Sequence, residues 1–198
     1  MKKGTQLLMS ALLMVGATCT AQAAVIDFES LAHNDDQIVD HGAIYEEEGF
    51  RLTNTAADPS FATYGTALDG WYVGSTALIN DNAGGTTVLT SMDGGLFRMN
   101  SIALAELYAM EEPFSVTFTG LLSNGSTVSQ VFSLDGLFGA ETFAFDSAFT
   151  NLVSVSWLQS EYFHQFDNID VVPVPEPSTF FLFGAGLLSV AAVRRRRK

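Results

Sequence analysis

The chain has 198 residues and a formal net charge of −13, with 22 Asp and Glu against nine Lys and Arg. Between residues 24 and 172 the imbalance is larger, because 21 of the acids but only Arg51 and Arg98 lie there. So negative a surface repels nucleic acid and anionic membranes, which excludes a nucleic-acid-binding role. The acids either keep the protein soluble or are partly neutralised by divalent cations.

The first 23 residues have the pattern of a secretory signal peptide. Lys2 and Lys3 give a positive start, and residues 7–15 are apolar apart from Ser10. Ala21 and Ala23 then provide the small side chains that signal peptidase reads, which predicts cleavage after Ala23.

The only cysteine, Cys19, lies inside this segment. A lipoprotein signal is the alternative, but Gly16-Ala17-Thr18 before the cysteine is a poor match. Cleavage after Ala23 leaves a mature protein without cysteine and therefore without a disulfide bond.

Residues 24–172 consist of short alternating apolar and polar runs separated by Gly, Asn and Asp, with no helical periodicity of useful length. Such runs predict strands with one buried face. In chain order, the expected strands are residues 25–29, 49–53, 71–73, 86–89, 96–107, 114–119, 127–134, 141–145, 152–157 and 166–172.

Two segments, residues 96–107 and 114–134, have further features in their sequence pattern. Residues 96–107 place Phe97 and Met99 on one face and Arg98 and Ile102 on the other, but residues 103–110 are also compatible with a helix. Residues 114–134 predict a hairpin, because Asn124-Gly125 fits a tight turn.

The pattern as a whole predicts an all-β protein, an antiparallel β-sandwich over residues 24–172. The 16 Phe residues of the chain supply aromatic side chains for the space between two sheets. A signal helix before the sandwich and a transmembrane helix after it complete the expected architecture.

Residues 173–198 form a separate tail. A proline-rich stretch is followed by an apolar run over residues 180–193 and then by a basic cluster at the end of the chain. The run is short for a membrane span, but flanking arginines can reach the interface. The basic cluster orients it with its end in the cytoplasm and the sandwich outside. The cluster consists of Arg194, Arg195, Arg196, Arg197 and Lys198.

This tail resembles the PEP-CTERM sorting signal of bacterial surface proteins, through Pro175, Glu176 and Pro177, the apolar run and the arginines. The resemblance implies recognition and cleavage near this motif by an exosortase. It also implies a Gram-negative bacterium that makes extracellular polysaccharide.

Residues 25–172 open with Ile-Asp-Phe-Glu at residues 26–29, have Gly-Phe at residues 49–50 and a Phe-rich hairpin, and close with Phe-Asp-Asn-Ile-Asp-Val at residues 166–171. This order resembles that of jelly-roll domains of the carbohydrate-binding-module type. This resemblance implies a structural calcium ion where the first and last strands meet. Asp27 and Glu29 would approach Asp167 or Asp170 there, and carboxylate oxygens suit calcium. The alternative is that these four acids are ordinary outward-facing strand positions.

No catalytic motif is present. The Gly-x-Ser-x-Gly nucleophile elbow of serine hydrolases is missing from the sequence. Paired carboxylates, which glycoside hydrolases use, occur by chance in so acidic a chain and therefore do not indicate such an enzyme. His33, His41 and His164 are each predicted to lie in a solvated loop rather than at a metal. A sugar-stacking platform among the aromatic residues is less favoured than ordinary packing. The residues concerned are Tyr64, Trp71, Tyr72, Trp157, Tyr162 and Phe163.

We therefore expect a non-enzymatic exported protein of the cell surface or exopolysaccharide matrix of a biofilm. Its expected partners are signal peptidase, an exosortase, the inner membrane before processing, and extracellular polysaccharide. A carbohydrate-binding domain with structural calcium and a secreted hydrolase are the two alternatives.

Overall fold

The computed structural model describes residues 22–107, 113–160 and 163–175. Within these ranges the regular structure is strand, apart from the short 3-10 helix η1 at Glu29–Leu31. No helix in the described ranges has the length and apolar character to cross a membrane. The expected signal helix and transmembrane helix lie outside the described residues.

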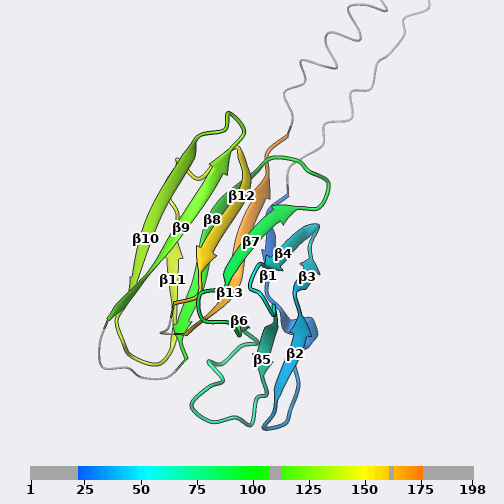
Figure 1. Ribbon diagram of the computed structural model, residues 1–198, viewed down its shortest axis with the longest axis vertical. Helices are drawn as coiled ribbons and strands as arrows, with labels where there is room; N and C mark the ends of the chain where they lie inside the picture. Colours follow the sequence, from blue (N-terminus) through cyan, green and yellow to red (C-terminus); the bar gives the residue numbers. More distant parts are fainter. Residues whose placement is uncertain (1–21, 108–112, 161–162, 176–198) are drawn as a thin grey trace, which may run out of the picture.

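The described residues form thirteen strands (Figure 1). They are β1 (Ala24–Ile26), β2 (Ile38–Gly42), β3 (Ile44–Glu47), β4 (Phe50–Asn54), β5 (Phe61–Tyr64), β6 (Leu78–Asn80), β7 (Thr86–Ser91), β8 (Phe97–Glu106), β9 (Phe114–Leu122), β10 (Thr127–Leu134), β11 (Ala140–Ala144), β12 (Leu152–Leu158) and β13 (His164–Pro173).

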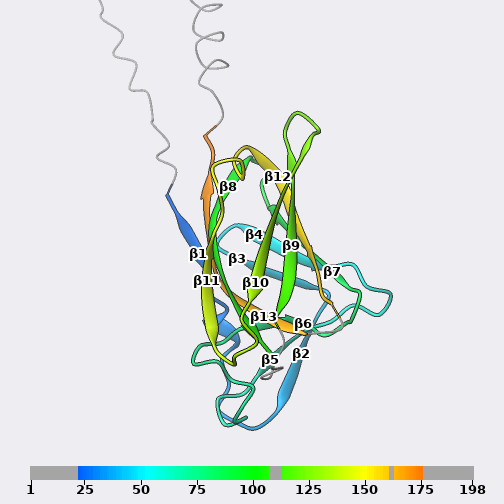
Figure 2. The same cartoon turned by 90° about the vertical axis from the view of Figure 1, so that its left-hand side faces the viewer.

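The strands form two antiparallel layers of a nearly closed sandwich (Figures 1 and 2). One layer contains β11, β8, β13, β6, β5 and β2, with β1 beside the second half of β13. The other runs β10, β9, β12, β7, β4 and β3. A single pairing of Leu152 with Phe97 links the layers through β12 and β8.

Aromatic side chains pack between the layers, as the composition predicted. Trp157 of β12 lies 5.1 Å from Phe166 of β13, ring centroid to ring centroid, and both side chains are buried. Phe132 of β10 stacks on Phe143 of β11 at 4.9 Å. Fully burying a side chain of this size contributes about 1.5–3 kcal/mol, so the aromatic core between the two layers is the main source of stability.

An irregularity where β8 pairs with β13 changes which residues face this core. The register shifts between Asp167 and Val171, and Asn168 has a positive φ of 47°. Because of the shift, Met99 and Ile102 both enter the same core cluster. The expectation that Ile102 faces away from Met99 is therefore wrong.

A smaller cluster packs on the outer side of the first layer. It joins Tyr64 and Leu107 to Trp71 in the loop after β5, with Tyr64 and Trp71 ring centroids 5.3 Å apart. The expected strand at residues 71–73 is wrong, because Trp71 lies in a turn where its N–H donates to the carbonyl of Leu68. Residues 103–106 are strand rather than helix.

Candidate functional site

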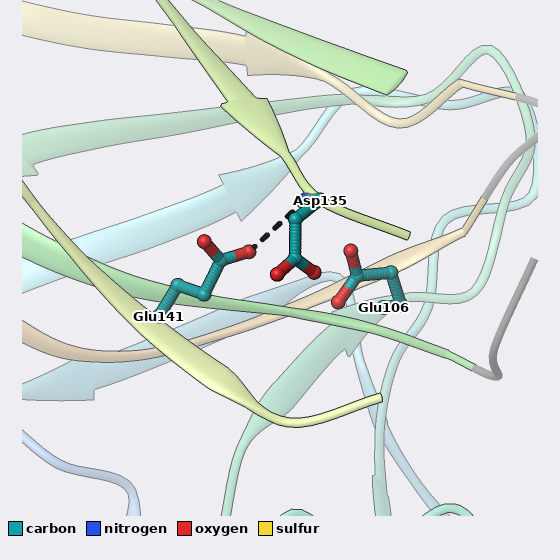
Figure 3. A group of neighbouring side chains, drawn as sticks. All are labelled: Glu106, Asp135 and Glu141. Atoms are coloured by element: carbon teal, nitrogen blue, oxygen red, sulfur yellow. Dashed lines mark hydrogen bonds between the residues drawn. The ribbon is translucent and has the colours of Figure 1, made fainter. Parts of the chain in front are cut away.

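Three carboxylates meet at one end of the sandwich (Figure 3). Glu106 ends β8, Asp135 follows β10, and Glu141 lies in β11. One carboxylate oxygen from each lies within 4.8 Å of the others. We call these three residues the carboxylate trio.

The pairing of strands explains why residues so far apart in the sequence meet. Glu141 pairs with Leu104 across β11 and β8, so it shares a face with Leu104 and with Glu106 two residues further on. Asp135 is positioned by the short loop that joins β10 to β11. Its N–H donates to Glu141 at 3.3 Å, and its own carboxylate accepts from the N–H of Leu137 at 2.8 Å.

Glu106 is the unusual member of the trio, because its side chain is fully buried. Its Oε1 accepts a hydrogen bond from the N–H of Gly136 at 2.9 Å, whereas its Oε2 has no hydrogen-bond partner. Burial raises the pKa of Glu106, and the negative charges of Glu141 and Asp135 raise it further. An ionised carboxylate is costly in such a place unless positive charge faces it.

Other buried polar side chains lie near Glu106. The prediction that His164 lies in a solvated loop is wrong, because it begins β13 and is fully buried. His164 pairs directly with Glu106 across β13 and β8, and neither of its ring nitrogens has a hydrogen-bond partner. Burial lowers the pKa of His164 to about 3, so its ring is neutral at physiological pH. Gln159 has a further unpaired buried oxygen. Unpaired buried polar atoms are uncommon in folded proteins.

The described residues offer no cation that balances the trio. Arg51 of β4 forms its ion pair with Glu46, at 2.6 Å. Arg98 lies at the opposite end of β8 from Glu106, a separation of about 26 Å at the usual rise of a strand. The negative charge of the trio is therefore not compensated by a described side chain.

Three of the four acids expected to bind calcium lie near one another. Glu29 accepts hydrogen bonds from the N–H and hydroxyl of Thr76 at 3.0 and 3.1 Å. Asp167 accepts from the hydroxyl of Ser75 at 2.5 Å and from the side-chain amide of Asn168 at 2.8 Å. Burial raises the pKa of Asp167 to about 6, with smaller contributions from the charges of Glu29 and Asp27.

Asp170 is held differently. It pairs with Val25 across β13 and β1, and its carboxylate accepts from the side-chain amide of Asn100 at 3.2 Å. None of the four expected calcium ligands belongs to the trio. Within the described ranges, the trio is the one group of three or more His, Cys, Asp or Glu side chains with ligand atoms close enough to share a metal ion. A calcium ion at Asp27, Glu29, Asp167 and Asp170 stays a prediction.

His33 and His41 converge on one hydroxyl, which the sequence spacing does not reveal. Nε2 of His41 lies 2.8 Å from Oγ1 of Thr63, and Nε2 of His33 lies 3.3 Å from the same atom. Nδ1 of His33 contacts Asp35 at 2.7 Å. Asp35, His33 and Thr63 thus follow one another as the acid, histidine and hydroxyl of a hydrolase catalytic triad do. Thr63 is fully buried, however, so a substrate cannot reach its hydroxyl.

The aromatic residues weighed as a sugar platform are mostly used for packing. Trp157 and Tyr64 are buried, and Trp71 and Phe163 pack against the outer cluster. Tyr162 lies outside the described residues. The packing interpretation therefore fits these four aromatic side chains. Tyr72 is half-buried and belongs to neither core cluster.

The start of the tail is fixed to the sandwich. β13 ends at Pro173, and the N–H of Val174 donates to the carbonyl of Leu96 at 2.7 Å. Val174 and Pro175 also line a pocket of about 390 Å³ beside Phe50 and Asp93. Of the expected processing residues, Ala23 is exposed just before β1. Pro175 lines the pocket just named. The remaining expected processing residues lie outside the described residues; they are Ala21, Glu176, Pro177, Arg194, Arg195, Arg196 and Arg197.

Comparison with known proteins decides the nature of the tail. Residues 173–197 match the PEP-CTERM protein-sorting motif. The chain carries a PEP-CTERM tail. This motif marks an exported protein that an exosortase directs to the cell surface, as the sequence resemblance implied. No curated protein matches the chain.

Solved structures with a similar arrangement of strands include two carbohydrate-binding modules, the class that the sandwich sequence resembles. The CBM22-1 xylan-binding domain of Paenibacillus barcinonensis Xyn10C has 12% identity and a TM-score of 0.40, covering 79% of this chain and 97% of that one. CBM29_1 of Piromyces equi has 13% identity and a TM-score of 0.41, covering 82% and 99%. Similarity at this level assigns no binding residue in the present chain.

The trio was not found from the sequence. Its members are scattered through an acidic chain, and only the register of β8 with β11 brings Glu106 and Glu141 together. The available signal was weak: Asp135 and Glu141 flank a short loop that contains Gly136 and Gly139.

Proposed function

We propose that this protein is a non-enzymatic component of the cell surface or exopolysaccharide matrix, and that its acidic sandwich is retained there because an exosortase, a transpeptidase-like protease, processes the tail. The PEP-CTERM tail carries this proposal. Before processing, the apolar run of the tail holds the chain in the inner membrane, with the sandwich on the outer side.

The position of the tail supports this order of events. The motif begins where β13 ends, so cleavage near Pro175 leaves all thirteen strands intact. The strong negative charge of the sandwich suits a protein that stays hydrated in a matrix of polysaccharide.

The test is to end the chain after Val174 and follow the protein in its host by cell fractionation. This truncation keeps β13 and the hydrogen bond from Val174 to Leu96. We expect the full chain to be cell-associated and shortened, and the truncated chain to be released into the medium with an unchanged melting temperature.

A second variant separates the motif from the apolar run. Replacing Pro175, Glu176 and Pro177 with alanine keeps the run and the arginines, so we expect an unshortened chain that stays in the membrane. If the truncated chain were as firmly attached to cells as the full chain, the proposal would be wrong. Retention of the released sandwich on purified polysaccharides, measured with and without calcium, tests the matrix partner.

We also propose a calcium ion that links the segment after β1 to β13. In the carbohydrate-binding alternative, this ion stabilises the domain. Asp27, Glu29 and Asp167 supply oxygen ligands of the kind calcium prefers, and Asp167 is buried among like charges. We expect calcium to raise the melting temperature of the wild type, and the increase to be smaller in Asp27→Ala. Equal melting temperatures of the wild type in calcium and in chelator would contradict this calcium site.

A further inference from the structure

The carboxylate trio differs from an ordinary patch of surface acids in one respect. An exposed acid is solvated by water, whereas Glu106 is fully buried and its Oε2 has no hydrogen-bond partner. One oxygen of this carboxylate lies within 4.8 Å of a carboxylate oxygen of Asp135 and of Glu141, which are also acids. Glu106 therefore needs either a proton or a cation to be stable in this position.

The local structure holds the three carboxylates together rather than letting them separate. Glu106 and Glu141 are fixed by neighbouring strands, and Glu106 is further held by the N–H of Gly136. Asp135 is drawn toward Glu141 because its N–H donates to that carboxylate. Like charges normally move apart, so a fold that brings three of them together resembles a site arranged for positive charge.

The types of ligand indicate which cation fits. All three side chains offer oxygen, and no cysteine lies in the described ranges. His164 is close in the strand register but does not belong to the group of ligand atoms within 4.8 Å. Hard divalent cations prefer such an all-oxygen set, and calcium accepts the irregular geometry of a site built from two strands and a loop.

We propose that Glu106, Asp135 and Glu141 bind a calcium ion at the end of the sandwich where β8, β10 and β11 meet. The site is separate from the one expected at Asp27, Glu29 and Asp167, and it does not depend on the sorting of the protein. Solvent reaches it through Asp135, which is exposed, and through Glu141, which is half-buried.

The ion would join the two layers of the sandwich. Asp135 follows β10 in one layer, whereas Glu106 and Glu141 belong to β8 and β11 in the other. Calcium at this position would fix the loop at residues 135–139 against β8. Modules that bind calcium outside cells often have affinities of about 10⁻⁴–10⁻³ M, which is the range to examine.

The test uses calcium chloride as the probe and the purified full-length protein, titrated by calorimetry to millimolar calcium after removal of metal. The informative variant is Glu106→Gln, which keeps the size of the side chain and an oxygen to accept from Gly136. The matched control is Asp58→Asn, which makes the same change of charge at an exposed acid of the loop after β4.

We expect Glu106→Gln to bind one calcium ion fewer per chain than the wild type, and Asp58→Asn to bind as the wild type does. Asp167→Asn should retain the binding event that Glu106→Gln loses, which distinguishes the two sites. In chelator, Glu106→Gln should melt at the same temperature as the wild type or higher, because it removes a buried negative charge.

Glu141→Gln provides a second variant in case Glu106→Gln does not fold, because Glu141 is only half-buried. It should lose the same binding event. The proposal is overturned if the wild type binds no calcium in the millimolar range, or if the folded Glu106→Gln or Glu141→Gln protein binds as many ions as the wild type.

Discussion

Replacing Asp167 with asparagine should change how the stability of the protein depends on pH. Asp167 is 2% exposed, and burial raises its pKa from 3.8 to about 6 in the folded state. The difference between 3.8 and about 6 corresponds to about 3 kcal/mol. Below pH 3.8 the carboxyl is protonated in both states, and the full stability is present. As the pH rises through 6, this stability is lost, because the folded state resists ionisation.

The wild-type profile alone does not isolate this effect, because His164 acts in the opposite direction. Burial lowers the pKa of His164 from 6.5 to about 3, so the unfolded state binds a proton that the folded state does not. Stability from His164 is therefore present above pH 6.5 and is lost on acidification. The useful quantity is the free energy of unfolding of Asp167→Asn minus that of the wild type, because His164 contributes equally to both.

This difference should become more positive by about 3 kcal/mol between pH 4 and pH 7.5. Lost hydrogen bonds from Ser75 and Asn168 would shift the whole curve by about 1–2 kcal/mol without changing its slope. The assay is urea unfolding at several pH values in chelator, so that no cation neutralises Asp167. A difference that stays constant within about 1 kcal/mol across this range would refute the reasoning.

The remaining predictions concern the core. His164→Leu should remove an acid sensitivity worth about 3 kcal/mol between pH 6.5 and pH 4. Urea unfolding at the two pH values measures it, and an equal loss in the variant would assign the sensitivity to other groups. Gly120→Ala should destabilise the protein by about 1–3 kcal/mol, because the added Cβ would lie 2.5 Å from Cδ2 of Leu152 and 3.0 Å from Cγ1 of Val128. Chemical unfolding at pH 7 measures the change, and a loss below about 0.5 kcal/mol would mean that Leu152 moves aside freely.

The parts of the fold that the sequence predicted well have local causes. The hairpin of β9 and β10 is confirmed, because Gly125 adopts a positive φ of 82° and the side chain of Asn124 accepts from the N–H of Ser126. The all-β sandwich is confirmed because alternation is strong in most of its strands. Both features depend on residues close together in the chain.

The parts that were missed depend on long-range packing. β5 has no alternation of buried and exposed residues, because one face meets the main core and the other is covered by the loop that contains Trp71. The exchange of faces at Ile102 depends on the irregular pairing of β8 with β13. Likewise, the trio depends on the register of β8 with β11, which alternation along a single strand does not specify.

The place of β13 has a mechanical consequence. A pull on the C-terminal end of β13 acts along a strand that pairs with β8 on one side and with β1 and β6 on the other. The hydrogen bonds of these ladders lie across the direction of force and share the load in shear. A force applied between the start of β1 and the end of β13 would instead separate these two strands one hydrogen bond at a time. The reason is that the strands are antiparallel and Ala24 lies opposite Val171.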